Sequence, residues 1–287
     1  MAFGQRRRRL GPTVRRLLEH RSFMLGTVLF VAVLAIALIG PLLVQADPYR
    51  MAIRLRFREP GSDFLLGTDN LGRSMLARVC TGGRLSLAIG FGVVALNAVF
   101  GVLLGAASGY VARLDGPIMR LSDALMAFPA VLLAIGIAAA MGPNAATVVV
   151  ALAIVYIPRT ARILRASVLV VRQLDYVEAA RAVGSGHLRL ILRHILPNCM
   201  APLIVQLSFV FAYAVLSEAV LSFLGLGASP EVPSWGTLIA EGRNYIREAP
   251  WLTISPGCAI AMTVLALNLI GDGLRDVLDP RLRIEQA

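Results

Sequence analysis

The most informative absence in this 287-residue sequence is lysine, because all 28 basic residues are arginine. A Walker A phosphate-binding loop requires a lysine after its glycines, and protein kinases and Schiff-base enzymes also depend on one. The sequence therefore excludes these three classes. If the protein uses ATP, the nucleotide must bind to another chain.

Cysteine and histidine are also scarce. The chain has three cysteines and three histidines: Cys80, Cys199, Cys258, His20, His187 and His194. Their spacing fits neither a metal site nor a disulfide framework. The motifs of zinc proteases (His-Glu-x-x-His) and serine hydrolases (Gly-x-Ser-x-Gly) are missing as well. We therefore expect no metal site, no cofactor and no catalytic activity on this chain.

Charged residues of either sign are few. They make up 16% of the chain, whereas soluble domains carry about 25%. Hydrophobic residues reach 57%, and the mean hydropathy is +0.73. A net charge of +11 is often typical of nucleic-acid binding, but here the arginines lie between long apolar runs. We therefore expect an all-α chain embedded in membrane lipid, with no nucleic-acid partner.

The long apolar runs predict six transmembrane helices. A bilayer core needs about 20 apolar residues for each helix. The runs cover 23–44, 85–112, 124–158, 201–224 and 249–271. The third of these predicts two helices, because the turn formers Gly142, Pro143 and Asn144 interrupt it, and we expect the second to continue past Pro158. A cleaved signal peptide is the alternative for 23–44, but a signal has an apolar core of only about 7–15 residues.

Six spans place both termini on one side, and the arginines indicate which side. Nineteen arginines lie in the tails and loops of the side that holds the termini, and nine lie on the other side. Because positive charge favours the cytoplasm, this distribution predicts N-in, C-in topology. The segment 45–84 weakens the prediction, because it would place seven arginines outside.

The segments outside the spans also carry patterns. Leu71, Met75 and Val79 follow Thr68-Asp69 at near-helical spacing. We therefore expect an interfacial amphipathic helix over 70–83 that has Thr68-Asp69 as its N-cap and leads into the second span. Trp235 and mixed charge predict a structured external loop over 231–248. The expected divisions are a basic tail (1–22), a first span with an external loop (23–84), a core membrane domain (85–275, with a loop at 172–198) and a second tail (276–287).

The segment 175–198 predicts a compact knob between the fourth and fifth spans. A short helix over 176–183 carries small alanines and a Glu178/Arg181 pair at i,i+3. Gly184-Ser185-Gly186 ends that helix, and a second amphipathic stretch follows. Pro197 then marks the turn into the fifth span.

This segment resembles the EAA loop of ABC-importer permeases, which reads Glu-Ala-Ala, three residues, Gly, nine residues, Ile, any residue and Leu-Pro. Glu178, Ala179, Ala180, Gly184, Leu196 and Pro197 fall in register, whereas His194 takes the usual isoleucine position. Segments 66–73 (LGTDNLGR), 221–227 (LSFLGLG) and 271–280 (GDGLRDVLDP) are similar to motifs of the C-type permease of dipeptide, oligopeptide and nickel importers. The resemblance covers nearly the whole chain.

The resemblance implies a function and partners. The loop would dock on a separate ATPase that binds ATP and magnesium, through Tyr176, Glu178, Ala179, Ala180, Arg181, Gly184, His194, Leu196 and Pro197. The assembly would hold a second permease, two ATPase subunits or domains and an extracytoplasmic solute-binding protein, in a bacterial or archaeal cytoplasmic membrane. Transport would follow alternating access, with di- or oligopeptides as the expected substrate and nickel or a metal chelate as the alternative. A stand-alone secondary transporter or channel is the different-class alternative, although the sequence lacks the internal repeats that such proteins often carry.

Polar residues inside the spans are candidates for the transport pathway. Glu218, Asn97 and Asn268 are such residues, because ionisable or polar groups in a membrane are costly and often functional. The alternative is structural, through hydrogen bonds between helices. We also expect Asp123 to pair with Arg120 or Arg162.

Overall fold

The computed structural model describes residues 12–44, 46–228 and 232–278, and within these ranges the chain is helical with no β-strand. The α-helices are α1 (Pro12–Glu19), α2 (Arg21–Leu43), α3 (Met75–Leu96), α4 (Val102–Tyr110), α5 (Ala112–Met126), α6 (Ala130–Met141), α7 (Ala145–Val171), α8 (Asp175–Ala182), α9 (His187–Arg189), α10 (Met200–Phe223), α11 (Trp235–Gly242) and α12 (Trp251–Leu278). Tighter or wider turns lie at Ile53–Leu55, Asn97–Gly101, Leu190–Ile195, Leu196–Cys199 and Arg243–Tyr245.

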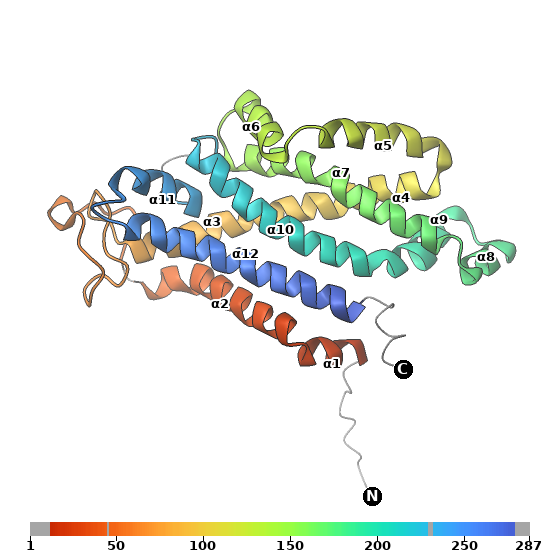
Figure 1. The fold of residues 1–287 in the computed structure, drawn as a ribbon, viewed down its shortest axis with the longest axis horizontal. Coiled ribbons are helices and arrows are strands. Elements are labelled where there is room, and N and C mark those ends of the chain that lie inside the picture. Colours follow the sequence, from red (N-terminus) through yellow and green to blue (C-terminus); the bar gives the residue numbers. More distant parts are fainter. Residues whose placement is uncertain (1–11, 45, 229–231, 279–287) are drawn as a thin grey trace, which may run out of the picture.

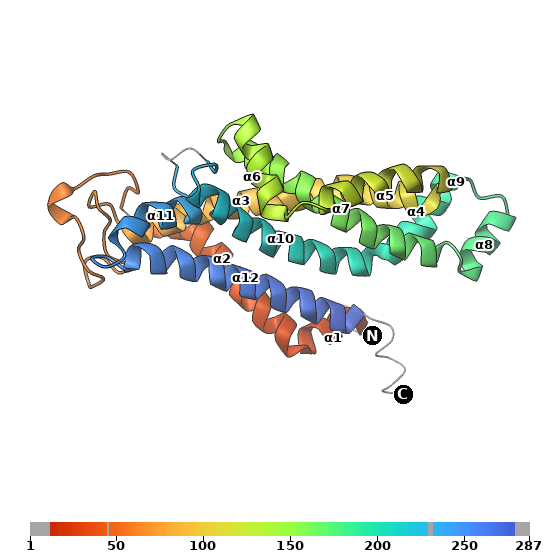
Figure 2. The ribbon, with the colours of Figure 1, turned by 45° about the horizontal axis from the view of Figure 1, so that its top comes forward.

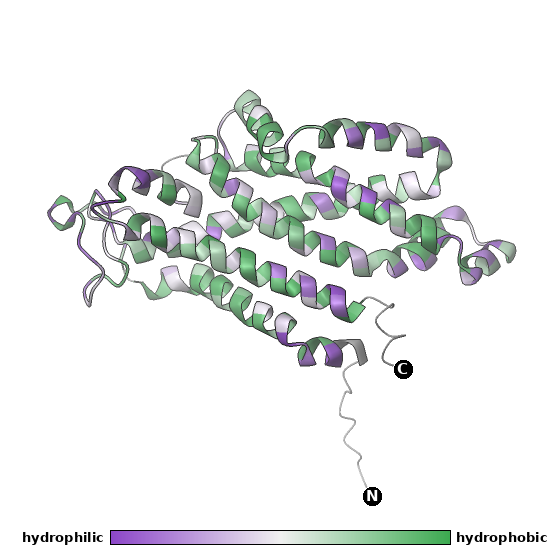
Figure 3. Cartoon of the chain, in the orientation of Figure 1, coloured by the Kyte–Doolittle hydropathy of each residue, from purple (hydrophilic) through white to green (hydrophobic). Residues whose placement is uncertain are grey.

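The long helices lie side by side in an elongated bundle (Figure 1). Helix α2 packs on α12, α12 on α10, and α10 on both α3 and α7. The segment 46–74 and α11 form one end, which we call the loop end. Helices α8 and α9, the start of α2 and the end of α12 lie toward the opposite end, which we call the knob end (Figure 2). Apolar residues follow the length of the helices, and polar residues gather toward both ends (Figure 3).

Five helical stretches are long and apolar enough to cross a membrane. They are Arg21–Leu43, Met75–Tyr110, Ala145–Val171, His187–Phe223 and Trp251–Leu278. The third expected span is not one continuous helix in the described part of the chain, because α5 and α6 meet at an angle of 91°. The number of spans reaches six only if this bent pair counts as one. Pro129 explains the bend, because it has no backbone N–H to donate and disfavours helical geometry at Phe128.

One expected boundary is wrong. There is no separate interfacial helix over 70–83, because α3 begins at Met75 and continues through a π turn to Tyr110 as one 36-residue stretch. Ser74, rather than Thr68-Asp69, caps it by accepting a hydrogen bond from the backbone N–H of Ala77. Pro197 does lie in a 3₁₀ turn directly before α10, although this turn belongs to the continuous helical stretch His187–Phe223.

Other expectations are confirmed. Helix α7 continues past Pro158 to Val171, and the turn before it contains Gly142 with φ +89° and Asn144 as N-cap. Helix α11 gives the expected structure to the 231–248 loop. Glycines at positions 101, 105 and 109 allow α4 and the preceding π turn to approach α7 closely, since a Cβ on Gly105 would lie 2.7 Å from the carbonyl oxygen of Ala161.

Candidate functional site

The knob, residues 175–198, begins with the predicted short helix and glycine cap. Helix α8 ends at Ala182, and Gly184 adopts φ +83°. The N–H of Ser185 donates to the carbonyl of Ala180 (3.1 Å), and the N–H of Gly184 donates to that of Arg181 (3.0 Å). A Cβ on Gly184 would meet nothing within 4 Å, so glycine is required here for its backbone conformation rather than for space.

One face of the knob is anchored on α7. Val177, Leu190 and Ile195 are fully buried against Leu164 and Val168 in a separate apolar cluster, which also contains Val171 and Cys199. Ala180 and Leu196 pack at the edge of this cluster. The apolar contacts therefore fix the position of the knob relative to the transmembrane helix that leads into it.

The opposite face of the knob is open. Glu178, Ala179 and Arg181 are exposed, and the described residues include no ion pair between Glu178 and Arg181. Three apolar side chains of the same segment are also exposed: Val183 is 83% exposed, Leu188 70% and Leu192 58%. Exposed apolar side chains clustered among charged residues are typical of a surface that binds a protein partner.

Sequence reasoning did not include these three residues in the site. The signal was present in the amphipathic stretch after Gly186, where Leu188 and Leu192 alternate with residues that turn out to be buried. The exposure of Val183 could not be predicted in this way, because Val183 directly follows α8 and lies outside the amphipathic stretch.

Polar contacts hold the second half of the knob. The Tyr176 hydroxyl donates to the carbonyl of His194 at 3.5 Å, and the Asn198 amide donates to the same oxygen at 2.7 Å. Partial burial raises the pKa of the Tyr176 phenol above its ordinary value. His187 and Tyr110, the last residue of α4, form a hydrogen bond of 2.7 Å. Pro197 is exposed, and His194 is half-buried.

Ion pairs connect α7 to α5 near the same end. Arg162 binds Asp123, which confirms one of the two predicted partners. One helical turn later, the Nη2 of Arg165 binds the Oδ2 of Asp115 at 2.6 Å. These pairs hold α5 along the half of α7 that leads into the knob.

Glu218 is fully buried on α10. It accepts hydrogen bonds from Ser86 on α3 (2.9 Å) and from Ser222 (2.7 Å). Ser86 in turn accepts from the backbone N–H of Trp235 at the start of α11 (3.1 Å). This network joins three helices, so the geometry supports the structural interpretation of Glu218.

Asn97 and Asn268 lie elsewhere. Asn97 is buried at the start of the π turn, where its amide donates to the carbonyl of Val93 (3.0 Å) and its oxygen accepts from Thr160 (3.1 Å). It lies about 16 Å further along the helix than Ser86, the partner of Glu218. Asn268 is half-buried on α12. The structure therefore does not bring the three pathway candidates together into one site.

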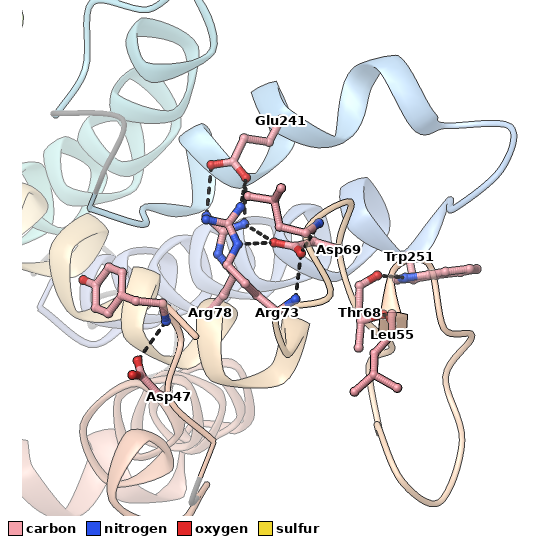
Figure 4. Close-up of polar contacts among 10 residues, drawn as sticks. Asp47, Leu55, Thr68, Asp69, Arg73, Arg78, Glu241 and Trp251 are labelled. Atoms are coloured by element: carbon pink, nitrogen blue, oxygen red, sulfur yellow. Dashed lines mark hydrogen bonds and ion pairs between the residues drawn. The ribbon is translucent and has the colours of Figure 1, made fainter. Parts of the chain in front are cut away.

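The loop end contains a charge network that sequence reasoning missed (Figure 4). Asp69 accepts from Arg73 (2.6 Å) and Arg78 (2.9 Å), and both arginines also bind Glu241 of α11, at 3.0 and 2.6 Å. The side chain of Arg78 is only 3% exposed. Arg84 donates to the carbonyl of Leu38 on α2 at 2.7 Å. Three of the seven arginines in 45–84 are therefore bound within the fold, which removes part of the objection to placing this segment outside.

Family models match most of the chain. Residues 97–284 match the family described as "Binding-protein-dependent transport system inner membrane component". Residues 11–60 match the family described as the N-terminal transmembrane domain of oligopeptide transport permease C.

Curated relatives match over nearly their whole length. A proposed peptide transport system permease of Brucella abortus biovar 1 (strain 9-941) is 54% identical, over 95% of this chain and 92% of the relative. The di/tripeptide transport system permease DppC of Pseudomonas aeruginosa (strain UCBPP-PA14) is 44% identical, over 92% of this chain and 90% of the relative.

A solved structure shares the fold. The MetNI methionine ABC transporter in an inward-facing conformation aligns with a TM-score of 0.60 and 17% identity, over 71% of this chain and 98% of the matched chain. The chain therefore belongs to the family of binding-protein-dependent transport system inner-membrane components, the permeases of ABC importers.

Proposed function

We propose that this chain is a C-type permease subunit that imports di- or oligopeptides across the bacterial or archaeal inner membrane by alternating access. Two relatives named for dipeptide transport support this substrate class: DppC of Pseudomonas aeruginosa, named for di- and tripeptides, and DppC of Haemophilus influenzae, which is 41% identical. The chain itself has no catalytic role, and ATP with magnesium binds to a partner ATPase.

The knob couples the chain to that ATPase. The single observation that carries this assignment is its two-sided construction: one face is buried on α7, and the other exposes Glu178, Ala179 and Arg181 beside apolar side chains. A force applied to the exposed face reaches α7 and α10 directly, because the knob is packed on one and continuous with the other. Gly184 and Pro197 shape the knob, and Tyr176, Ala180, His194 and Leu196 support it.

The remaining partners follow from this placement. The knob end lies in the cytoplasm, so two ATPase subunits or domains bind there. The loop end faces outward and receives the solute-binding protein. A second permease completes the pathway, and lipid surrounds the remaining apolar surface.

The polar residues of the spans have separate roles. Glu218 and Asn97 hold helices together through their buried hydrogen bonds, so they position the gate rather than contact the substrate. Asn268 is the remaining candidate for a pathway residue, because it is only half-buried.

Charge reversal on the knob tests the coupling. In the complete importer, we expect Glu178→Lys to reduce uptake of radiolabelled glycyl-leucine and the amount of ATPase that co-purifies, by roughly tenfold each. Glu19→Lys is the matched control, because Glu19 is also an exposed carboxylate toward the knob end but lies on α1. Normal uptake and normal ATPase recovery with Glu178→Lys would contradict the assignment.

A further inference from the structure

A cavity of about 790 Å³ lies between α7, α10 and α12. Its wall extends from Arg159 to Val171 on α7 and includes Asn198 just before α10 and Leu278 at the end of α12. The cavity therefore lies toward the knob end of the bundle, where α10 begins and α12 ends (Figure 1). Its size is within the range of pockets that bind small molecules.

The cavity has a positive lining. Arg159 and Arg275 contribute to its wall, and none of its lining residues is acidic. The neighbouring acids on α12, Asp272 and Asp276, are not among the residues that line it. In the part of the chain that the structure describes, neither arginine forms an ion pair.

Other arginines on α7 differ sharply from Arg159. Arg162 and Arg165 face α5, and each binds an aspartate of that helix. Arg159 lies beside the Tyr213 ring instead, with its guanidinium carbon 5.9 Å from the ring centroid. One face of α7 thus neutralises its own charge within the protein, while the face on the cavity retains it.

A buried amide provides a second, independent observation. Gln206 lines the cavity and is only 5% exposed. Among the described residues, its side chain has no hydrogen-bond partner. The side chain lines the cavity, so its amide is placed to donate a hydrogen bond to an occupant that carries oxygen atoms.

We propose that this cavity binds the phosphate headgroup of an anionic phospholipid from the inner leaflet. Arg159 and Arg275 contact the phosphate, and Gln206 donates to an oxygen of the headgroup. An acyl chain lies along Ile163, Val205 and the neighbouring Phe209, which give the cavity its apolar walls. Basic pockets between transmembrane helices on the cytoplasmic side are suited to such headgroups. The inference rests on the proposed orientation, which places the knob end inside.

Lipid binding to the purified importer complex tests the proposal. The delipidated complex is titrated with dioleoylphosphatidylglycerol or dioleoylphosphatidylcholine, and bound lipid is counted by native mass spectrometry. We expect preferential binding of the anionic lipid, weakened about fivefold by Arg159→Gln and again by Arg275→Gln. Arg113→Gln, which removes an exposed arginine of α5 outside the cavity, should leave binding unchanged.

Charge-retaining variants separate this effect from misfolding. Arg159→Lys and Arg275→Lys should keep most of the preference for the anionic lipid. Equal binding of both lipids, displacement of the lipid by equimolar inorganic phosphate, or loss with the lysine variants as great as with the glutamine variants would each overturn the proposal. Because the readout is bound lipid and not uptake, a wrong substrate assignment would leave this result intact, while a separate reporter fusion after residue 60 tests the orientation.

Discussion

The knob end and the loop end are stabilised by different interactions. At the knob end, a dry apolar cluster with Val177, Leu190 and Ile195 fixes the position, and charged residues remain exposed. At the loop end, the charged side chains of Asp69 and Arg78 are buried. Arg78 forms ion pairs with both Asp69 and Glu241. An apolar anchor leaves the exposed surface free for a partner, whereas a buried ion network fixes one relative position of its members.

This difference determines which substitutions should destabilise each end. Buried ion pairs are sensitive to the loss of one member, because the remaining charge is left in a poorly solvated place. Apolar packing is tolerant of exposed substitutions but sensitive to cavities. Substitutions that remove one means of support at a time should therefore affect the two ends differently.

The largest expected effect is at the loop end. Asp69→Ala removes the acceptor of two arginines and of the backbone N–H groups of Leu71 and Arg73. Because Arg78 is almost fully buried, we expect the free energy of unfolding to fall by at least about 3 kcal/mol. Thermal and denaturant unfolding of the detergent-solubilised protein measures this change.

An exposed aspartate of the same segment provides the control. Asp63→Ala should change the unfolding free energy by less than about 0.5 kcal/mol. A loss with Asp69→Ala as small as that of the control would show that the network does not support the loop end, and the comparison would fail there.

The next largest effect is expected at the knob. Leu190→Ala leaves a cavity in the cluster against Leu164 and Val168, so the unfolding free energy should fall by about 2–3 kcal/mol. Leu188→Ala, on the exposed side two residues away, should have almost no effect. Equal losses for both leucines in denaturant unfolding would mean that the knob is not anchored by one face.

The sequence predicts the elements of this fold better than their contacts. Long apolar runs reveal spans because crossing a bilayer requires an uninterrupted length of apolar chain. The 91° bend between α5 and α6 escaped prediction, because apolar residues continue on both sides of Pro129. The burial of the start of α3 was also missed, since an amphipathic pattern does not distinguish a surface helix from one buried against other helices.

The site could be predicted only in part, for a related reason. The glycine cap at Gly184 follows from local backbone geometry, and the structure confirms it. Glu218 and its partner Ser86 are 132 residues apart in the sequence, and Arg78 and its partner Glu241 are 163 residues apart. No local sequence pattern can therefore predict these contacts. The burial of Glu218 likewise depends on three helices meeting at one place.

Substitutions on the exposed face of the knob should have the smallest effect on the stability of the permease. The same substitutions should have the largest effect on its binding to the ATPase. The double variant Val183→Ser/Leu188→Ser should change the unfolding free energy by less than about 1 kcal/mol, because both side chains are mostly exposed. If this face binds the ATPase, removing two apolar side chains from the interface should weaken association roughly tenfold or more. Titration of the ATPase against the permease assembly in nanodiscs measures that affinity.

A matched double variant at the loop end isolates the position of the effect. Met51→Ser/Ile53→Ser removes two mostly exposed apolar side chains from the opposite end, so ATPase affinity should be unchanged. If both double variants weaken ATPase binding alike, general loss of apolar surface is responsible, and the knob has no special role. If only the knob variant does so while its unfolding free energy is retained, the anchoring face and the binding face of the knob are separable. That separation is what a coupling element requires, because the side chains that bind the partner then take no part in the packing that holds the element on α7.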